Sequence, residues 1–385
     1  MKTIPYRIIA VICWLWAFSA QGQTKPDADS TKPGFIRRIA AKFDSTNAKD
    51  GGFVPIPLLY FTPDTRLAYG LAGAYYFKIK NTEKNTSTRL SYIAGLADYT
   101  QNRQLDIWSY WYVFLRDERW ILKGELRYRN FPDRYYGIGN NTPATNVERY
   151  SYNLISIKKL VMRKLASNIY FGGDYNFSSL FNFQTDNAEQ LSQGMVTGSR
   201  GGRNSGFGLV FLVDTRDNVA NATKGQFLEI SSYRYGRVFG GQFNYTNLLL
   251  TYSRYHRLPW GKNHFLCFNT SANLNFGDPP FVFMAQAGNE DILRGYARNR
   301  YRDLRFAATQ VEYRLPLFWR VGLVGFAGVG DVFDRPSDVR WNTLKYSLGG
   351  GLRFMLNRKE RINIRLDYGI GRANTGFYLG IMEAF

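Results

Sequence analysis

Long stretches in which apolar and polar residues alternate constrain this chain more than any other feature of its sequence. In the segment RINIRLDYGIG, residues 361–371, every second residue is isoleucine, leucine or tyrosine, with polar residues or glycine between them. Such alternation is typical of a β-strand with one apolar and one polar face. The stretches run for about 10–14 residues, longer than the 5–6 of an ordinary strand, whereas a tilted membrane-crossing strand needs about 9–11. The apolar face would be the core of a soluble sandwich, but the strand length favours a membrane.

Counting gives about sixteen such segments, which alternate between long connections at one end and mostly short turns at the other. Long outer loops and short inner turns are typical of outer-membrane barrels. A sheet edge exposed to lipid would leave backbone groups without partners, so the sheet is expected to close. The sequence therefore predicts an all-β fold, a 16-stranded antiparallel transmembrane β-barrel over residues 53–385. The segments begin near Phe53, Leu67, Thr88, Gln104, Arg119, Arg149, Asn168, Gly206, Gly225, Phe243, His264, Arg305, Val321, Leu344, Arg361 and Thr375.

The N-terminal residues have a different pattern. Residues 1–22 contain a basic start, an apolar run at Ile8–Phe18 and small residues near Ala20, which together predict a secretory signal peptide. Residues 23–52 form a short polar segment in which Gly34–Phe43 has helical spacing, compatible with an amphipathic helix or a plug. After cleavage only Cys267 remains, so no internal disulfide is expected. An exported chain without an apolar helix of ~20 residues has only strands with which to span a membrane.

A basic stretch, DILRGYARNRYRD at residues 291–303, interrupts the pattern between the eleventh and twelfth segments. Within it, the tetrapeptide Leu293-Arg294-Gly295-Tyr296 resembles the Val-Arg-Gly-Phe/Tyr motif of the BamA/TamA family, also called bacterial surface antigens. In that family the sixth outer loop folds back into a sixteen-stranded barrel and carries the motif at its tip. The resemblance therefore implies a sixth outer loop that folds inward here.

Neighbouring segments extend the resemblance. Residues 306–317 are similar to the family's twelfth strand, whose glutamate meets the loop arginine, and Glu312 occupies that place on the inward face. Residues 325–333 are similar to the thirteenth strand, in which Phe326 and Gly330 match the supporting aromatic and glycine. Gly328 stands where the family has an acid, so one expected partner of the arginine is missing. Alternation places the nearby Asp331 on the opposite face.

Physical chemistry gives the motif a role as a latch. Arg294 inside a narrow lumen is desolvated and needs an anion, which Glu312 can supply as a charge-assisted pair. Gly295 lets the backbone approach the wall, and Tyr296 is expected to pack on Phe326. The remaining arginines of the stretch are expected to line the lumen or to face lipopolysaccharide phosphates; they are Arg298, Arg300 and Arg302.

The C-terminus and the short N-terminal segment indicate which proteins and lipids this chain is expected to bind. The sequence ends GIMEAF, and its Gly380 and Phe385 match an assembly signal for the barrel-assembly machinery, although Glu383 takes a place that is more often apolar. Family members that fold or export proteins carry periplasmic polypeptide-transport domains, which residues 23–52 are too short to hold. The resemblance thus implies a barrel-only member, with outer-membrane lipids and lipopolysaccharide around it and a periplasmic partner supplied in trans.

Two functions remain open. The first is an accessory in the assembly or translocation of outer-membrane proteins or lipids, with an openable seam between the first and last strands. Pro55 and Pro57 fit such a seam because proline donates no ladder hydrogen bond. The second is a narrow anion-preferring channel or a structural barrel. The formal net charge is +20, and Lys345, Arg353 and Arg365 are expected to face the lumen.

Other functions have little support in the sequence. His256 and His264 are the only histidines, and neither accompanies a serine–acid arrangement, so we expect no enzyme. Two histidines and one mature cysteine give no metal-ligand spacing, and no cofactor site is expected. The net positive charge is compatible with nucleic-acid binding in principle, but the predicted export and the barrel pattern argue against that function.

Overall fold

The computed structural model describes residues 52–62, 66–80, 88–115, 117–185, 190–259, 263–297, 299–372 and 374–385. The predicted signal peptide, the segment 34–43 and Arg298 lie outside these residues. In the described part, no helix has the length and apolar character needed to cross a membrane.

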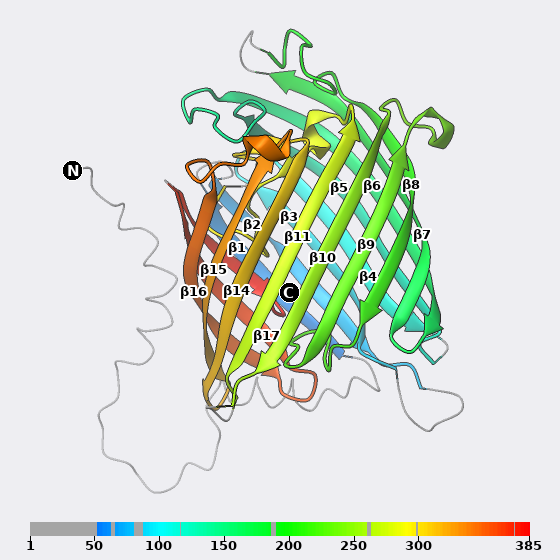
Figure 1. Cartoon of the computed structure of the whole chain (residues 1–385), viewed down its shortest axis with the longest axis vertical. Coiled ribbons are helices and arrows are strands. Elements are labelled where there is room, and N and C mark those ends of the chain that lie inside the picture. Colours follow the sequence, from blue (N-terminus) through cyan, green and yellow to red (C-terminus); the bar gives the residue numbers. More distant parts are fainter. Residues whose placement is uncertain are drawn as a thin grey trace, which may run out of the picture. The chain divides into compact units, whose positions relative to one another are not determined.

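In the part of the chain that the structure describes, sixteen strands form one antiparallel sheet in which consecutive strands pair in chain order (Figure 1). The all-β prediction is confirmed, and each expected segment start lies within four residues of an observed one. The strands are β1 (Gly52–Thr62), β2 (Arg66–Phe77), β3 (Ser91–Thr100), β4 (Leu105–Leu115), β5 (Trp120–Tyr135), β6 (Glu148–Ala166), β7 (Ile169–Thr185), β8 (Gly202–Asp214), β9 (Gly225–Tyr235), β10 (Tyr245–Arg257), β11 (Phe265–Gly277), β14 (Arg305–Phe318), β15 (Val321–Phe333), β16 (Lys345–Asn357), β17 (Ile362–Gly371) and β18 (Asn374–Ile381).

Short elements lie in the connections between these strands. Among the residues described, two two-residue strands pair with each other in the loop between β11 and β14, and three 3₁₀ turns lie in outer connections. They are β12 (Ala285–Gln286), β13 (Arg302–Asp303), η1 (Arg237–Phe239), η2 (Phe281–Phe283) and η3 (Pro336–Asp338).

The two faces of the sheet have opposite chemistry. On β17, Leu366, Tyr368 and Ile370 are exposed, whereas Arg365 and Asp367, which alternate with them, are buried. The same pattern recurs along β14, where the buried residues are mainly polar. A wall that exposes leucine and buries aspartate is the reverse of a soluble protein and suits lipid outside and a polar interior.

The polar face curls inward, so that strands far apart in the chain meet across the interior (Figure 1). Lys78 after β2 lies 2.8 Å from Glu360 in the β16–β17 turn, and Arg89 before β3 lies 2.9 Å from Asp214 of β8. No ladder among the described residues pairs β1 with β18, so closure at this seam stays a prediction.

The long segment between β11 and β14 folds back against the inner wall. Its side chains join those of β14 and β15 in one buried apolar cluster, which anchors the segment inside the barrel. The cluster comprises Ala285, Ala287, Ile292, Leu293, Tyr296, Phe306, Ala308 and Val332.

Candidate functional site inside the barrel

Arg294 lies at the centre of the site and is completely buried. Its Nη2 lies 2.6 Å from Glu312 Oε2 on β14, and its Nη1 lies 2.6 Å from Asp367 Oδ2 on β17. The guanidinium carbon lies 3.5 Å from the ring centroid of Phe326 on β15. Two carboxylates and an aromatic face therefore hold one buried cation that belongs to the loop.

Asp367 is the residue that the sequence analysis missed. The family acid is absent at Gly328, and the second carboxylate comes from β17 instead. A Cβ at Gly328 would lie 3.1 Å from Gln310 Cβ and 3.5 Å from Leu293 Cδ2, so little space remains there for an acid. The available signal was the acid on the inward face of the segment 361–371, but only the fold reveals that this face meets the loop.

Further arginines extend the cluster towards the inner end of the barrel. Arg314 Nε lies 2.7 Å from Glu312 Oε1, and Arg353 bridges Asp367 to Glu383, whose Oε2 lies 2.7 Å from Arg353 Nε. The carboxylates of Glu312 and Asp367 are each shared between arginines, and Glu383 is also almost fully buried. Removing one charge would therefore leave others uncompensated in a poorly solvated place.

The three cations expected in the lumen are all paired with acids. Arg353 contacts Asp367, and Arg365 Nη2 lies 3.0 Å from Asp291 of the loop. Lys345 Nζ lies 2.6 Å from Asp331, which is buried at the outer end of β15 rather than turned towards lipid. The three residues are buried on the inward face, and because each is paired with an acid they add little net positive charge there. The anion preference of the lumen stays a prediction.

Gly295 brings the loop backbone against the last strands. Its φ is +112°, and a Cβ there would lie 2.6 Å from the nitrogen of Gly371 and 2.6 Å from the carbonyl carbon of Ile370. Its amide donates a 2.8 Å hydrogen bond to the hydroxyl of Tyr378 on β18. Only glycine satisfies both the backbone conformation and the close approach.

Tyr296 forms hydrogen bonds with two backbone groups. Its hydroxyl donates to the carbonyl of Tyr346 at 3.0 Å and accepts from the amide of Arg372 at 2.9 Å. Its ring lies 6.1 Å from that of Tyr301, whereas the guanidinium of Arg294 lies over the ring of Phe326. The expected packing of Tyr296 on Phe326 stays a prediction.

Other predicted site residues form the surrounding wall. Leu293 is fully buried in the apolar cluster. Gly330 pairs with Ala308 across the β14–β15 ladder, where a Cβ would lie 2.4 Å from Ala308 Cβ. Arg300 donates to the hydroxyl and carbonyl of Thr142 at 2.8 and 2.6 Å, and the buried Arg302 donates to the carbonyl of Phe281 at 3.1 Å. These two arginines bind other loop segments and do not face external phosphates.

The C-terminal residues turn into the barrel. β18 ends at Ile381, and Phe385 packs 6.2 Å from the ring of Tyr255 while its carbonyl oxygen accepts a 3.0 Å hydrogen bond from Arg314. Gly380 stays in β18 opposite Arg365. The assembly signal stays a prediction, but the charged residue within it has a structural role in the ion cluster.

The inner mouth is covered by the connection between β8 and β9. Ala220 packs with residues of β2, β16 and β17, and its carbonyl accepts a 3.1 Å hydrogen bond from the amide of Glu383. Asp217 Oδ2 lies 2.6 Å from Arg361 Nη1. This connection, residues 215–224, is called the inner strap below, and the C-terminal residues hold it in place.

Fold and site together define a class: large antiparallel membrane barrels in which an outer loop is pinned inside by a buried arginine. The Omp85 superfamily domain matches residues 80–385, and the chain belongs to that superfamily. It is thus an outer-membrane β-barrel and not an enzyme.

Solved structures share this fold. BamA from Haemophilus ducreyi lacking POTRA domains 1–3 superposes with a TM-score of 0.54 and 11% identity, over 86% of this chain and 69% of that one. CdiB from Acinetobacter baumannii and CdiB from Escherichia coli each give 0.52 and 11%, over 86% of this chain. The chain spans only 59% and 62% of those two proteins. No curated protein sequence matches significantly.

Proposed function

We propose that this barrel assists the assembly or translocation of outer-membrane proteins or lipids, with the inward loop as a latch on the seam. The observation that carries the proposal is the contact of the loop tip with the C-terminal strands. Arg294 binds Asp367 on β17, and the Gly295 amide binds Tyr378 on β18. Because β18 borders the predicted seam, release of the loop would free one edge of it.

The other edge of the seam has a matching weakness. β1 carries Pro55 and Pro57, paired in register with Gly73 and Leu71 of β2. Prolines cannot donate ladder hydrogen bonds, so a strand that contains two of them pairs weakly with a second neighbour. A seam that opens sideways would offer edges for a client strand, and a periplasmic partner in trans would deliver the client.

A channel is the second candidate, favoured by a polar cavity of about 530 Å³ between the inner wall of β5–β11 and the loop. Its lining includes Arg127, Asp174, Asn204 and Tyr245. The paired lumen cations weaken anion preference, and the inner strap narrows the inner mouth. Single-channel recordings in planar bilayers distinguish the channel from the assembly role. Steady conductance of the wild-type barrel supports the channel, and absence of conductance supports the assembly role.

The direct test of the assembly role is depletion in cells, followed by quantification of outer-membrane proteins and lipids. We expect a subset of barrel proteins or one lipid class to fall while total envelope protein stays constant. Complementation with Arg294→Ala should restore less than wild type. If depletion changes no protein and no lipid, the assembly proposal is wrong.

A further inference from the structure

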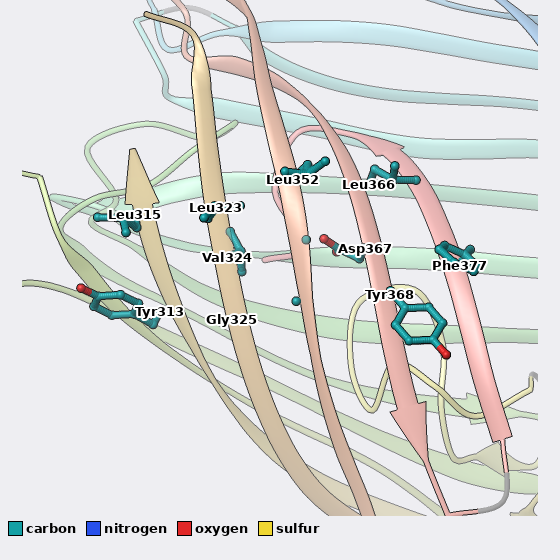
Figure 2. Close-up of a pocket in the computed structure, with 12 residues that line it drawn as sticks. Tyr313, Leu315, Leu323, Val324, Gly325, Leu352, Leu366, Asp367, Tyr368 and Phe377 are labelled. Carbon is teal, nitrogen blue, oxygen red and sulfur yellow. The ribbon is translucent and has the colours of Figure 1, made fainter. Parts of the chain in front are cut away.

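A hollow of about 540 Å³ lies on the lipid-facing side of the wall, across strands β14–β18 (Figure 2). The ladders place five outward residues in one row across these strands: Tyr313, Gly325, Gly350, Tyr368 and Phe377. The two glycines stand in the row between two tyrosines. The hollow is therefore the space that two missing side chains leave in an otherwise bulky wall.

The space at both glycines is open. A Cβ on Gly325 would meet nothing within 4 Å, and one on Gly350 would meet only the carbonyl oxygen of Val324, at 3.2 Å. Tyr313 and Tyr368 are three strand spacings apart, ~14 Å. The next row towards the inner end consists of leucines, which floor the hollow with apolar side chains; they are Leu315, Leu323, Leu352 and Leu366.

Two aromatic residues stand at the inner end of this wall. They are Phe318, the last residue of β14, and Trp319 in the β14–β15 turn. Both aromatic side chains are exposed, at 68% and 47%. Beyond the leucine row, the inner end of the wall thus exposes aromatic side chains, which suit the headgroup region.

Cations stand at the same end of the wall. Arg358 and Lys359 are exposed in the β16–β17 turn, and Arg358 Nη2 donates a 3.0 Å hydrogen bond to the carbonyl of Trp319. Gly350 lies eight residues before Arg358, or ~26 Å along the strand, and a strand tilt of about 40° reduces this to a depth of ~20 Å. Half of a hydrocarbon core is about 15 Å. The separation therefore matches a phosphate at the turn and the end of its acyl chain in the hollow.

We propose that this hollow seats one acyl chain of a phospholipid from the inner leaflet, with its phosphate at Arg358 and Lys359. The chain supplies the apolar volume that Gly325 and Gly350 lack, and the two tyrosines limit its sideways movement. The two cations favour a phospholipid with an anionic headgroup, because basic residues near a membrane surface attract anionic lipids.

The position gives the site a connection to the latch. Gly351 and Asp367 pair across the β16–β17 ladder directly beside the hollow, and a Cβ on Gly351 would lie 1.9 Å from Asp367 Oδ1. The wall between the hollow and the buried ion cluster is thus only backbone. An acyl chain in the hollow keeps water away from the outer side of that cluster, where a low dielectric strengthens its ion pairs.

The test uses the full-length barrel in vesicles of zwitterionic phospholipid with about one fifth anionic phospholipid. The probe is a phospholipid with a diazirine near the end of one acyl chain, and peptide mass spectrometry maps the adducts after illumination. We expect adducts on Leu352 and Leu366 at least fivefold above those on exposed apolar residues of β3, such as Ile93. Adducts spread evenly over the wild-type wall would overturn the proposal without any variant.

Substitutions provide the second part of the crosslinking test. The double variant Gly325→Leu/Gly350→Leu fills the hollow and should lower the adducts there at least fivefold. Ala97→Leu adds a similar group to the exposed face of β3, between Leu71 and Ile107, and should change nothing. Arg358→Gln/Lys359→Gln should lower adduct yield from anionic probe more than from zwitterionic probe. Unchanged yield in the filled variant, with its folded gel mobility intact, rules the site out.

Discussion

Arg294 and Asp367 lie 73 positions apart in the chain, yet their side chains meet at 2.6 Å and neither is exposed. The contact joins an outer loop to β17, the strand beside the last one. Asp367 thus supplies the second carboxylate, which the sequence lacks at Gly328. The ion cluster is thus complete, with its second carboxylate on a different strand from the one that the family resemblance indicated.

Replacing Arg294 with alanine should reduce the free energy of unfolding by about 3–5 kcal/mol, because Glu312 and Asp367 would keep buried charges with fewer partners. Urea unfolding of the refolded barrel in detergent, followed by tryptophan fluorescence, measures the change. The matched control is Arg335→Ala, whose side chain is 79% exposed in a 3.7 Å pair with Asp334 and should contribute under about 1 kcal/mol. Equal stability of the two variants would refute the latch.

Asp367→Asn tests the unpredicted partner. It leaves Arg294 and Arg353 with one carboxylate fewer, and we expect a loss of about 3 kcal/mol. A double-mutant cycle with Arg294→Met should give a coupling energy of about 1–3 kcal/mol, since the two groups touch. Additive effects in the cycle would show that the contact contributes nothing of its own.

Gly295→Ala should expel the loop tip from the wall. The new methyl group would collide with the backbone of Ile370 and Gly371, in addition to the strain of a positive φ of about 1–3 kcal/mol. Gly240→Ala is the control, because Gly240 also has positive φ, +85°, but open space around its Cβ position. Protease cleavage in residues 290–300 should rise for Gly295→Ala alone. Similar cleavage of both variants would mean that the close approach is unimportant.

Acid should loosen the inner strap. Burial acts to raise the pKa of the Asp217 carboxyl, but hydrogen bonds from Thr223 and Arg361 outweigh it and hold the pKa below its ordinary value. A lowered folded-state pKa means that the contribution is complete above the ordinary value of 3.8 and is lost as the pH falls through the folded value.

Asp217→Asn should therefore cost about 1–3 kcal/mol at pH 7 and flatten the loss of stability below about pH 4. The measurement is the unfolding midpoint of both proteins between pH 2.5 and about 7, at constant ionic strength. If the unfolding midpoint of the variant ran parallel to that of wild type over the whole pH range, Asp217 would not be the source of the acid sensitivity.

The strand pattern and the loop motif were accessible from the sequence because they depend on local order. Alternation along β17 follows from the period of a strand, whatever its neighbours are. The motif at 293–296 lies in one short stretch, and Glu312 lies on the strand that follows this loop. The family resemblance implied the pairing of Arg294 with Glu312, which involves the loop and its next strand alone.

Partners that belong to distant strands were not accessible. Asp367 reaches the loop only because the sheet curls and the loop folds inward, and the pairing of Lys345, Arg353 and Arg365 with acids has the same origin. The inward turn of Phe385 depends on its hydrogen bond with Arg314, 71 positions earlier in the chain. The inner strap likewise depends on distant segments, through the contacts of Ala220 with Glu383 and of Ala222 with Arg314.

The sequence by itself determined that this chain forms long two-faced strands, their approximate number and the loop that carries the arginine, since periodicity and local motifs are properties of neighbouring residues. Only the tertiary structure decided which charges meet and where the wall is hollow. Register between strands sets those contacts, and register is a relation between segments that no single stretch of sequence contains.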